Sequence, residues 1–165
     1  MYMKFLILIF ACLVNIQITN AQLKTTATCP PFTVDILAGN VNELTPKSNW
    51  AEVKAIFPCS TQLIEKDSAN VCAGVFYKDK GIYFYTDRDY IEIRDNFKGK
   101  LTPQLLGANR GSLFTLLGHP KIKDISWDAF QTEYGTLILY YTKANKINKI
   151  QFSSKTTDAI KLCEQ

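Results

Sequence analysis

Hydrophobic and polar residues alternate over two long stretches of the chain, which is the pattern of strands that bury one face. The first stretch, CAGVFYKDKGIYFYTDRDYIEIR, is rich in β-branched and aromatic residues and is broken by turn residues at Asp79-Lys80-Gly81 and at Asp87-Arg88-Asp89. It predicts a three-stranded antiparallel meander over 73–78, 81–86 and 90–94. The second stretch predicts strands near 126–130, 135–142 and 147–153.

A helical pattern precedes the first meander. Trp50, Val53 and Phe57 recur at helical spacing, after a Thr45-Pro46 pair and before Pro58. Proline suits the first turn of a helix because its missing N–H has no partner there, and it stops a helix at the other end. We therefore expect a helix from about Thr45-Pro46 to Phe57. Residues 22–31 are expected to be irregular, and 32–37 to form a short strand.

The same order of elements then recurs in the sequence. Leu101-Thr102-Pro103 repeats Leu44-Thr45-Pro46, and Tyr141-Thr142 repeats Tyr85-Thr86. The two offsets, 57 and 56 residues, are nearly equal, as a duplicated unit requires. Identity between the halves is low, so chance remains the alternative to duplication.

The predicted fold class is α+β, with two similar units of one helix and a three-stranded antiparallel meander after a cleaved signal peptide. The expected organisation is a signal peptide over 1–21, a leader and short strand over 22–43, a first helix-meander unit over 44–95 and a second over 96–165. The second unit is expected to end with a helix or turn over 157–162.

The N-terminal segment has the features of an export signal. Lys4 supplies a positive charge, residues 5–14 are apolar, and Thr19-Asn20-Ala21 offers small residues, so we expect cleavage before Gln22. The apolar run is too short for a membrane span, and no transmembrane segment is expected. A lipid anchor at Cys12 is the alternative, which the bulky Phe10 disfavours. The expected location is secreted or periplasmic.

Charge excludes one class of partner. The chain has 19 Lys and Arg against 15 Asp and Glu, interspersed, with a net charge of +4. This is not the footprint of a nucleic-acid binder, so no nucleic-acid partner is expected. The locally basic stretch KANKINK (143–149) is interpreted as a solvated turn and the polar face of a strand.

Four cysteines remain after cleavage: Cys29, Cys59, Cys72 and Cys163. An even number in an exported chain predicts two disulfides, with three possible connectivities. We favour Cys59 with Cys72, which closes a short loop, and Cys29 with Cys163, which joins the two ends of the mature chain. Zinc is the alternative, but no pair has C-x-x-C spacing and there is only one histidine, so no metal is expected.

The only histidine, His119, lies in LFTLLGHP. The leucines follow helical spacing, Gly118 stands where a left-handed residue ends a helix, and Pro120 cannot continue it. His119 is therefore interpreted as a helix-end residue. The chain has no G-x-S-x-G or H-E-x-x-H motif, and we assign no catalytic residue and no cofactor.

Acidic residues gather in TDRDYIEIRDN, where Asp87, Asp89, Glu92 and Asp95 invite a calcium or a hydrolase interpretation. A calcium loop needs a glycine at its sixth position, which is absent here. Glycoside hydrolysis requires two carboxyl groups at a defined distance, and the sequence does not fix the distance between any two of these residues. A solvated sheet face with cross-strand ion pairs is the preferred interpretation.

Alternation places Ile91 and Ile93 on one strand face, which puts Tyr90, Glu92 and Arg94 on the other. A neighbouring strand can bring tyrosines beside them. Tyrosine and arginine are common at the centres of protein interfaces. The candidate binding residues are therefore Tyr83, Tyr85, Tyr90, Glu92 and Arg94.

A helix that ends in LLGHP, followed by a meander whose late strand reads KINKIQF, resembles the small modules of SmpA/OmlA lipoproteins of the β-barrel assembly machinery. It also resembles their tandem relative, the β-lactamase inhibitory protein family. The match covers mainly 100–154 and more weakly 45–94. The family's lipid-attachment motif is not matched, and Arg110-Gly111-Ser112 matches the helix start only loosely. The resemblance implies a non-enzymatic module that binds other proteins through sheet faces and loops.

We therefore expect a secreted or periplasmic, non-enzymatic protein-binding module of the inhibitor or assembly type, which uses a sheet face to contact another protein. The alternative is an exported enzyme, for example a hydrolase, with either His119 or the carboxylates of Asp87, Asp89 and Glu92 in its site. A histidine within hydrogen-bond reach of Ser112, Ser126 or a carboxylate would favour the enzyme.

Overall fold

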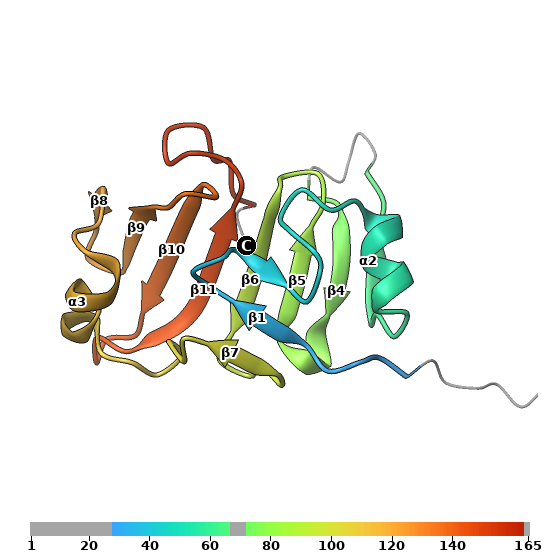
Figure 1. The fold of residues 1–165 in the computed structure, drawn as a ribbon, viewed down its shortest axis with the longest axis horizontal. Coiled ribbons are helices and arrows are strands. Elements are labelled where there is room, and N and C mark those ends of the chain that lie inside the picture. The colour runs from blue at the N-terminus through green and yellow to red at the C-terminus, as the bar shows by residue number, and fades with distance from the viewer. Residues whose placement is uncertain (1–27, 67–71, 164–165) are drawn as a thin grey trace, which may run out of the picture.

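A computed structural model describes residues 28–66 and 72–163. Its main element is an eight-stranded antiparallel sheet with the strand order β3-β4-β5-β6-β11-β10-β9-β8 (Figure 1). In that order the strands are Gln62–Ile64, Gly74–Tyr77, Ile82–Tyr85, Tyr90–Arg94, Ile147–Ser153, Thr136–Tyr141, Trp127–Gln131 and Ile122–Lys123. The six strands predicted from alternation are confirmed to within about two residues at each end.

The predicted arrangement of two separate helix-meander units is wrong. β6 of the first meander pairs with β11 of the second, with Ile93 opposite Ile150 and Glu92 opposite Gln151, so both meanders belong to one sheet. The apparent repeat at Leu101-Thr102-Pro103 does not begin a helix either, because Lys100–Thr102 forms a strand, β7. The described chain is mostly β, with two short α-helices.

A small sheet covers one face of the large one. It has the order β2-β1-β7, from Asn40–Val41, Thr33–Asp35 and Lys100–Thr102, and β1 runs parallel to β7. Figure 1 shows β1 lying across the middle of the large sheet, with β7 below it near the lower end of the sheet. The predicted strand at 32–37 is therefore present, and its partner β7 is a strand that local pattern did not predict.

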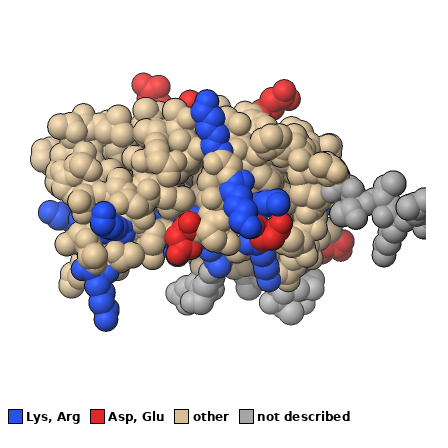
Figure 2. Space-filling model, turned by 90° about the horizontal axis from the view of Figure 1, so that it is seen from below, with Lys and Arg blue, Asp and Glu red and all other residues tan. Residues whose placement is uncertain are grey.

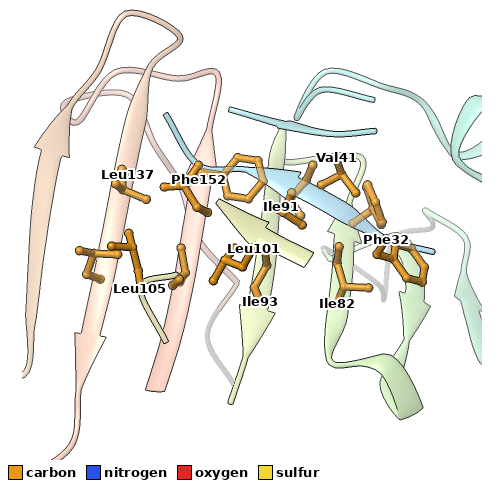
Figure 3. Close-up of a cluster of buried hydrophobic side chains, with 14 of the residues drawn as sticks. Phe32, Val41, Ile82, Ile91, Ile93, Leu101, Leu105, Leu137 and Phe152 are labelled. Atoms are coloured by element: carbon orange, nitrogen blue, oxygen red, sulfur yellow. The ribbon is translucent and has the colours of Figure 1, made fainter. Parts of the chain in front are cut away.

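The main core lies between these two layers, and Figure 3 shows side chains from both layers meeting there. Alternate residues of the large sheet supply one side: Val75, Tyr77, Ile82, Phe84, Ile91, Ile93, Phe130, Leu137, Leu139, Ile150 and Phe152. The covering segments supply the other: Phe32, Val34, Ile36, Val41, Leu44, Val53, Phe57, Leu101, Leu105 and Leu113. Because a strand has a side-chain period of two, the same registers send the intervening residues to the opposite face.

The first helix, α2 (Trp50–Ile56), begins later than the Thr45-Pro46 pair predicts. Asn49 caps it, since its side chain accepts hydrogen bonds from the N–H groups of Ala51 and Glu52 while the Glu52 carboxylate accepts from the Asn49 N–H. This reciprocal capping box satisfies N–H groups that the helix itself leaves free. Thr45 instead starts a turn closed by Ser48.

The second helix is a single turn. A 3₁₀ segment, η3 (Arg110–Ser112), leads into α3 (Phe114–Leu117), which ends at Gly118 with φ of +70°. Only glycine adopts this left-handed backbone without strain, so the predicted helix end at LFTLLGHP is confirmed. A further 3₁₀ turn, η2 (Lys78–Lys80), joins β4 to β5 and closes on Gly81 at φ +68°.

The four described cysteines are all disulfide-bonded, as predicted, but the favoured pairing is wrong. Cys29 pairs with Cys59 and Cys72 pairs with Cys163, with Cα–Cα separations of 5.4 and 5.9 Å. The first bond ties the segment before β1 to the end of α2, and the second ties the C-terminal segment to the start of β4. Two disulfides indicate an oxidising, extracytoplasmic environment.

The predicted signal peptide, its cleavage point and Cys12 lie outside the described residues. Within the described part of the chain no helix could cross a bilayer, and α2 has only 7 residues.

Candidate binding face

The face of the large sheet opposite the main core, here called the second face, combines tyrosines with charged and amide side chains. Cross-strand register places Tyr83 opposite Glu92, Glu92 opposite Gln151, and Tyr85 opposite Tyr90. All five predicted binding residues lie on this face. Its central members are Phe76, Tyr83, Tyr85, Tyr90, Glu92, Arg94, Ile138, Tyr140, Lys149 and Gln151.

The C-terminal segment 154–163, here called the strap, crosses this face after β11. Leu162 and Cys163 pack on a cluster formed by Phe76 and the tyrosines of β5 and β6. Tyr83, Tyr85 and Tyr90 are only 7, 4 and 1% exposed. The face is therefore largely covered at the tyrosines, where the sequence predicted an open surface.

Tyr90 lies under the strap and holds it. Its ring stacks on Tyr85 with centroids 4.3 Å apart, and its hydroxyl accepts a hydrogen bond from the Cys163 N–H at 3.3 Å. Burial raises the pKa of Tyr90 far above its ordinary value, so the hydroxyl is neutral at physiological pH. Tyr90 is a structural member of the face.

Glu92 is the buried centre of the face, at 1% exposure. One carboxylate oxygen accepts from Arg94 Nε at 2.6 Å, and the other accepts from Gln151 Nε2 at 2.6 Å. Tyr140 completes the chain by donating to Gln151 Oε1 at 2.7 Å. Burial raises the pKa of Tyr140 to about 12, with the Glu92 charge adding to the effect, so Tyr140 keeps the proton that it donates.

Arg94 connects this buried network to solvent. Its guanidinium lies over the Tyr83 ring, 4.1 Å from the centroid, and its side chain is 32% exposed. Burial lowers the pKa of Arg94, and the hydrogen bond and charge of Glu92 more than offset this, so the group stays cationic. The arrangement holds a cation in a fixed position on an aromatic ring.

The strap leaves an open hollow on each side. The hollow toward β3, here called the Tyr83 hollow, has a volume of about 460 Å³ and is lined by Gln62, Phe76, Lys78, Tyr83, Tyr85 and Arg94 together with Ile64 and the Cys72–Cys163 disulfide. The hollow toward β8 is smaller, about 300 Å³, and its walls are mainly apolar, with Ile122, Trp127, Ile138, Ile160 and Leu162 among them. Of these two hollows, only the Tyr83 hollow combines aromatic with cationic side chains, so it is the candidate binding site.

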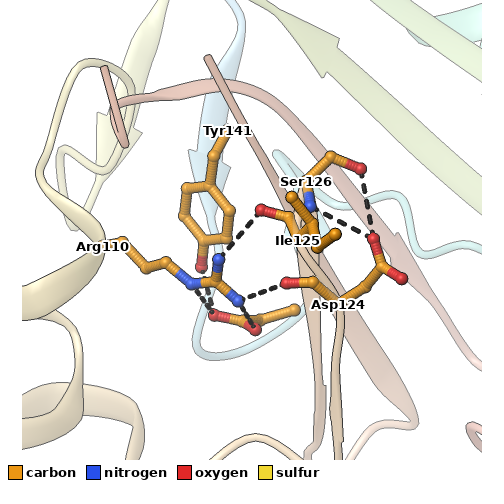
Figure 4. A network of polar contacts seen from close by, with 6 residues as sticks. Arg110, Asp124, Ile125, Ser126 and Tyr141 are labelled. Carbon is orange, nitrogen blue, oxygen red and sulfur yellow. Dashed lines mark hydrogen bonds and ion pairs between the residues drawn. The ribbon is translucent and has the colours of Figure 1, made fainter. Parts of the chain in front are cut away.

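A second polar network, shown in Figure 4, joins η3 to strands β9 and β10. Arg110 donates to both carboxylate oxygens of Asp128, at 2.9 and 2.5 Å, and Tyr141 donates to Asp128 at 2.8 Å. The remaining Arg110 bonds go to the carbonyls of Asp124 and Ile125. Because all three nitrogens of this guanidinium bond internally, its role is to join η3 to β9 and to the segment before β9.

The residues named for the alternative enzyme site bond to different partners and do not form one common network. Glu92 belongs to the network above, whereas Asp89, in the turn before β6, forms an ion pair with Lys155 of the strap at 2.7 Å. Ser112 donates to the Asn109 carbonyl, and Ser126 bonds to Asp124. His119 is exposed after α3, with its ring 5.6 Å from that of Phe114.

The lysine-rich segment 143–149 forms the exposed β10–β11 turn and the start of β11, as predicted. It lies at the same end of the sheet as the β4–β5 turn and the turn after β6. Figure 2 looks at this end and shows lysine and arginine side chains spread over it, with acidic side chains among and around them. Exposed lysines in these turns are Lys78, Lys98, Lys143 and Lys146.

Across residues 28–66 and 72–163, no group of three or more histidine, cysteine or acidic side chains is placed to hold a metal ion. No protein-family model, curated protein or solved structure matches the chain.

Sequence reasoning missed several members of the face. Phe76 could have been found, since Val75 and Tyr77 flank it and alternation then sends it to the second face. Gln151 and Tyr140 could not, because their place beside Glu92 depends on the pairing of β6 with β11, which no local pattern specifies.

Proposed function

We propose that the protein is a secreted or periplasmic, non-catalytic binding module that receives another protein in the Tyr83 hollow. The observation that carries the proposal is Arg94, held over the Tyr83 ring by the buried Glu92 and facing an open hollow beside an edge strand. Tyrosine and arginine are over-represented among residues that dominate binding energy in protein interfaces. The geometry is preorganised, so little side-chain entropy is lost on binding.

A protein partner suits this site better than a small molecule. Small-molecule sites enclose most of the ligand, whereas this hollow is open and continues to the edge of the sheet at β3. Among the described residues, the cations Lys78 and Arg94 line it and no acidic side chain does. The expected contact is therefore a partner segment with an aromatic or aliphatic anchor and an acidic side chain.

Photo-cross-linking in the native extracytoplasmic fraction tests the proposal. A photoreactive amino acid replaces Lys78, an exposed residue on the rim of the Tyr83 hollow, and a matched variant carries it at Glu133, an exposed residue of the β9–β10 turn. We expect one protein to be captured from position 78 and not from position 133. The captured protein, once purified, is expected to bind the unmodified chain in solution. Equal capture from both positions would count against this hollow as the site.

A further inference from the structure

The two edges of the large sheet differ in their capacity to accept a further strand. The β8 edge is two residues long, contains Lys123 and follows Pro120-Lys121, and short length, lysine and proline all discourage strand pairing. The β3 edge consists of Gln62-Leu63-Ile64, without a charged residue or a proline. Among residues 28–66 and 72–163, no strand pairs with β3 on its outer side. Of the two edges, β3 is therefore the better suited to accept an added strand.

Contacts on the inner side hold the backbone of this edge in place. Cys59, just before β3, is disulfide-bonded to Cys29. The Thr61 hydroxyl donates to the Phe76 carbonyl at 2.9 Å and accepts from the Lys78 N–H at 2.8 Å. β3 itself is extended and paired with β4. Because the edge is already ordered, a segment that joins it loses only its own conformational freedom.

A hollow lies on each face of this edge. The Tyr83 hollow, on the second face, is lined by Gln62. A hollow of about 540 Å³ lies on the core side between Leu63 and Trp50 of α2 and is here called the Trp50 hollow. The register agrees with this division, because Gln62 is opposite Phe76 of the second face and Leu63 is opposite Val75 of the main core. Successive residues of β3 therefore face different hollows.

The two hollows differ in chemistry. Among the described residues, the Tyr83 hollow is lined by the cations Lys78 and Arg94 and by no acidic side chain. The Trp50 hollow offers apolar surface, since the Trp50 side chain is 54% exposed. Its described charged residues are Glu65, Asp87 and Lys66, so its lining disfavours an acidic side chain. The first hollow therefore suits an acidic side chain and the second a large apolar one.

We propose that a partner protein adds an extended segment to β3 as a further strand of the large sheet. Side chains of a strand alternate between its two faces, so every second residue of the segment enters the same hollow. Acidic residues lie beside Lys78 and Arg94, and the apolar residues between them lie against Trp50 and Leu63. Backbone hydrogen bonds to β3 hold the segment, and the two hollows select its sequence. The inference rests on the proposed function, because it specifies how the partner enters the Tyr83 hollow.

Charge favours an acidic segment over a second copy of this chain. An antiparallel pair of two β3 strands has its twofold axis perpendicular to the sheet, so both Tyr83 hollows would lie on the same face of the joined sheet. That arrangement brings together two sets of cations from Lys78 and Arg94, whereas an acidic segment neutralises one set.

The test uses the oxidised mature chain, with acetyl-Asp-Leu-Asp-Leu-Asp-Leu-amide as the probe. In an extended strand the N–H groups of alternate residues point to the same edge. The peptide is therefore made in two further forms, one N-methylated at the three aspartates and one at the three leucines. We expect one of these two forms to bind at least tenfold more weakly than the unmethylated peptide, and the other to bind as tightly. A peptide of the same composition without alternation, acetyl-Asp-Asp-Asp-Leu-Leu-Leu-amide, is expected to bind at least tenfold more weakly.

NMR titration and amide hydrogen exchange locate the bound peptide. Exchange is expected to slow in β3 and to stay unchanged in β8, the opposite edge. Lys78→Glu is expected to weaken binding of the peptide at least tenfold, whereas the matched variant Lys123→Glu in β8 binds as the parent does.

Four results would overturn the proposal: an equal effect of the two N-methylations, protection at β8 in place of β3, absence of binding at millimolar peptide, or dimerisation of the free chain through β3, which would make a second copy the occupant. Binding that shifts the NMR signals of Tyr83 and Arg94 but does not depend on the place of methylation overturns strand addition and leaves the proposed function intact. Failure of the proposed function itself appears separately, as equal photo-cross-linking from positions 78 and 133.

Discussion

At the scale of single residues, alternation predicts which way a side chain points but not what covers it. Ile91 and Ile93 do face the main core, and Tyr90, Glu92 and Arg94 do share the other face. Nothing local to that strand indicates that Tyr90 lies under the strap or that Glu92 meets Gln151, since both contacts join residues more than 50 positions apart.

Asp87→Asn is expected to stabilise the fold at pH 7 by about 1 kcal/mol, because an amide replaces a buried carboxylate whose Oδ1 atom has no hydrogen-bond partner among the described residues. Burial raises the pKa of Asp87 in the folded protein. The unfolded chain therefore releases this proton at lower pH, near 3.9, and the stability of the parent falls as pH rises from there through the folded pKa. Denaturant unfolding against pH should show the gain from Asp87→Asn vanish in acid. A constant gain at all pH values would contradict this explanation.

Glu92→Ala is expected to cost about 2 kcal/mol, because it removes the buried carboxylate that accepts hydrogen bonds from Arg94 and from the buried Gln151. The double variant Glu92→Gln/Arg94→Met removes both charges and keeps their volume, so its cost should be below about 1 kcal/mol. Urea unfolding of the single and double variants measures the two costs. Equal losses in both would show that the charge pair is not coupled.

At the scale of elements, strands with strong alternation are predictable and short edge elements are not. The six long strands lie where the pattern places them, whereas β3, β7 and β8 have two or three residues each and form through their partners. The position of α2 follows from the Asn49 capping box, which outweighs the proline signal at Pro46. Disulfide pairing depends on the path of the strap and cannot be deduced from cysteine spacing.

The strap depends on its disulfide. A Cys72→Ala/Cys163→Ala variant opens a loop with a sequence separation of 91 residues and is expected to lose about 3 to 5 kcal/mol of stability. Hydrogen exchange should rise first at the amides of positions 162 and 163, while the amides of β10 remain protected. Uniform loss of protection across the sheet would show that the strap is not a separate element.

At the scale of the whole molecule, the important feature is that one sheet spans both predicted units. β6 and β11 are neighbouring strands at the centre of that sheet, and their core side chains belong to one hydrophobic cluster. Neither half can therefore bury its apolar surface alone. Fragments 44–95 and 96–165 are therefore expected to be unfolded separately, and the full chain should unfold in one transition. Circular dichroism of the fragments checks this, and a stable fold in either fragment would restore the two-unit arrangement.

Calorimetric titration of the captured partner protein tests the central claim most directly, namely that Arg94 over Tyr83 forms the binding site. The titrated forms are the unmodified chain, the Glu92→Gln/Arg94→Met variant and a Lys143→Ala control on an exposed turn. We expect the double variant, still folded by circular dichroism, to bind at least tenfold more weakly, a loss of about 1.4 kcal/mol, and the control to bind as the parent does. Unchanged affinity in the folded double variant would contradict the claim.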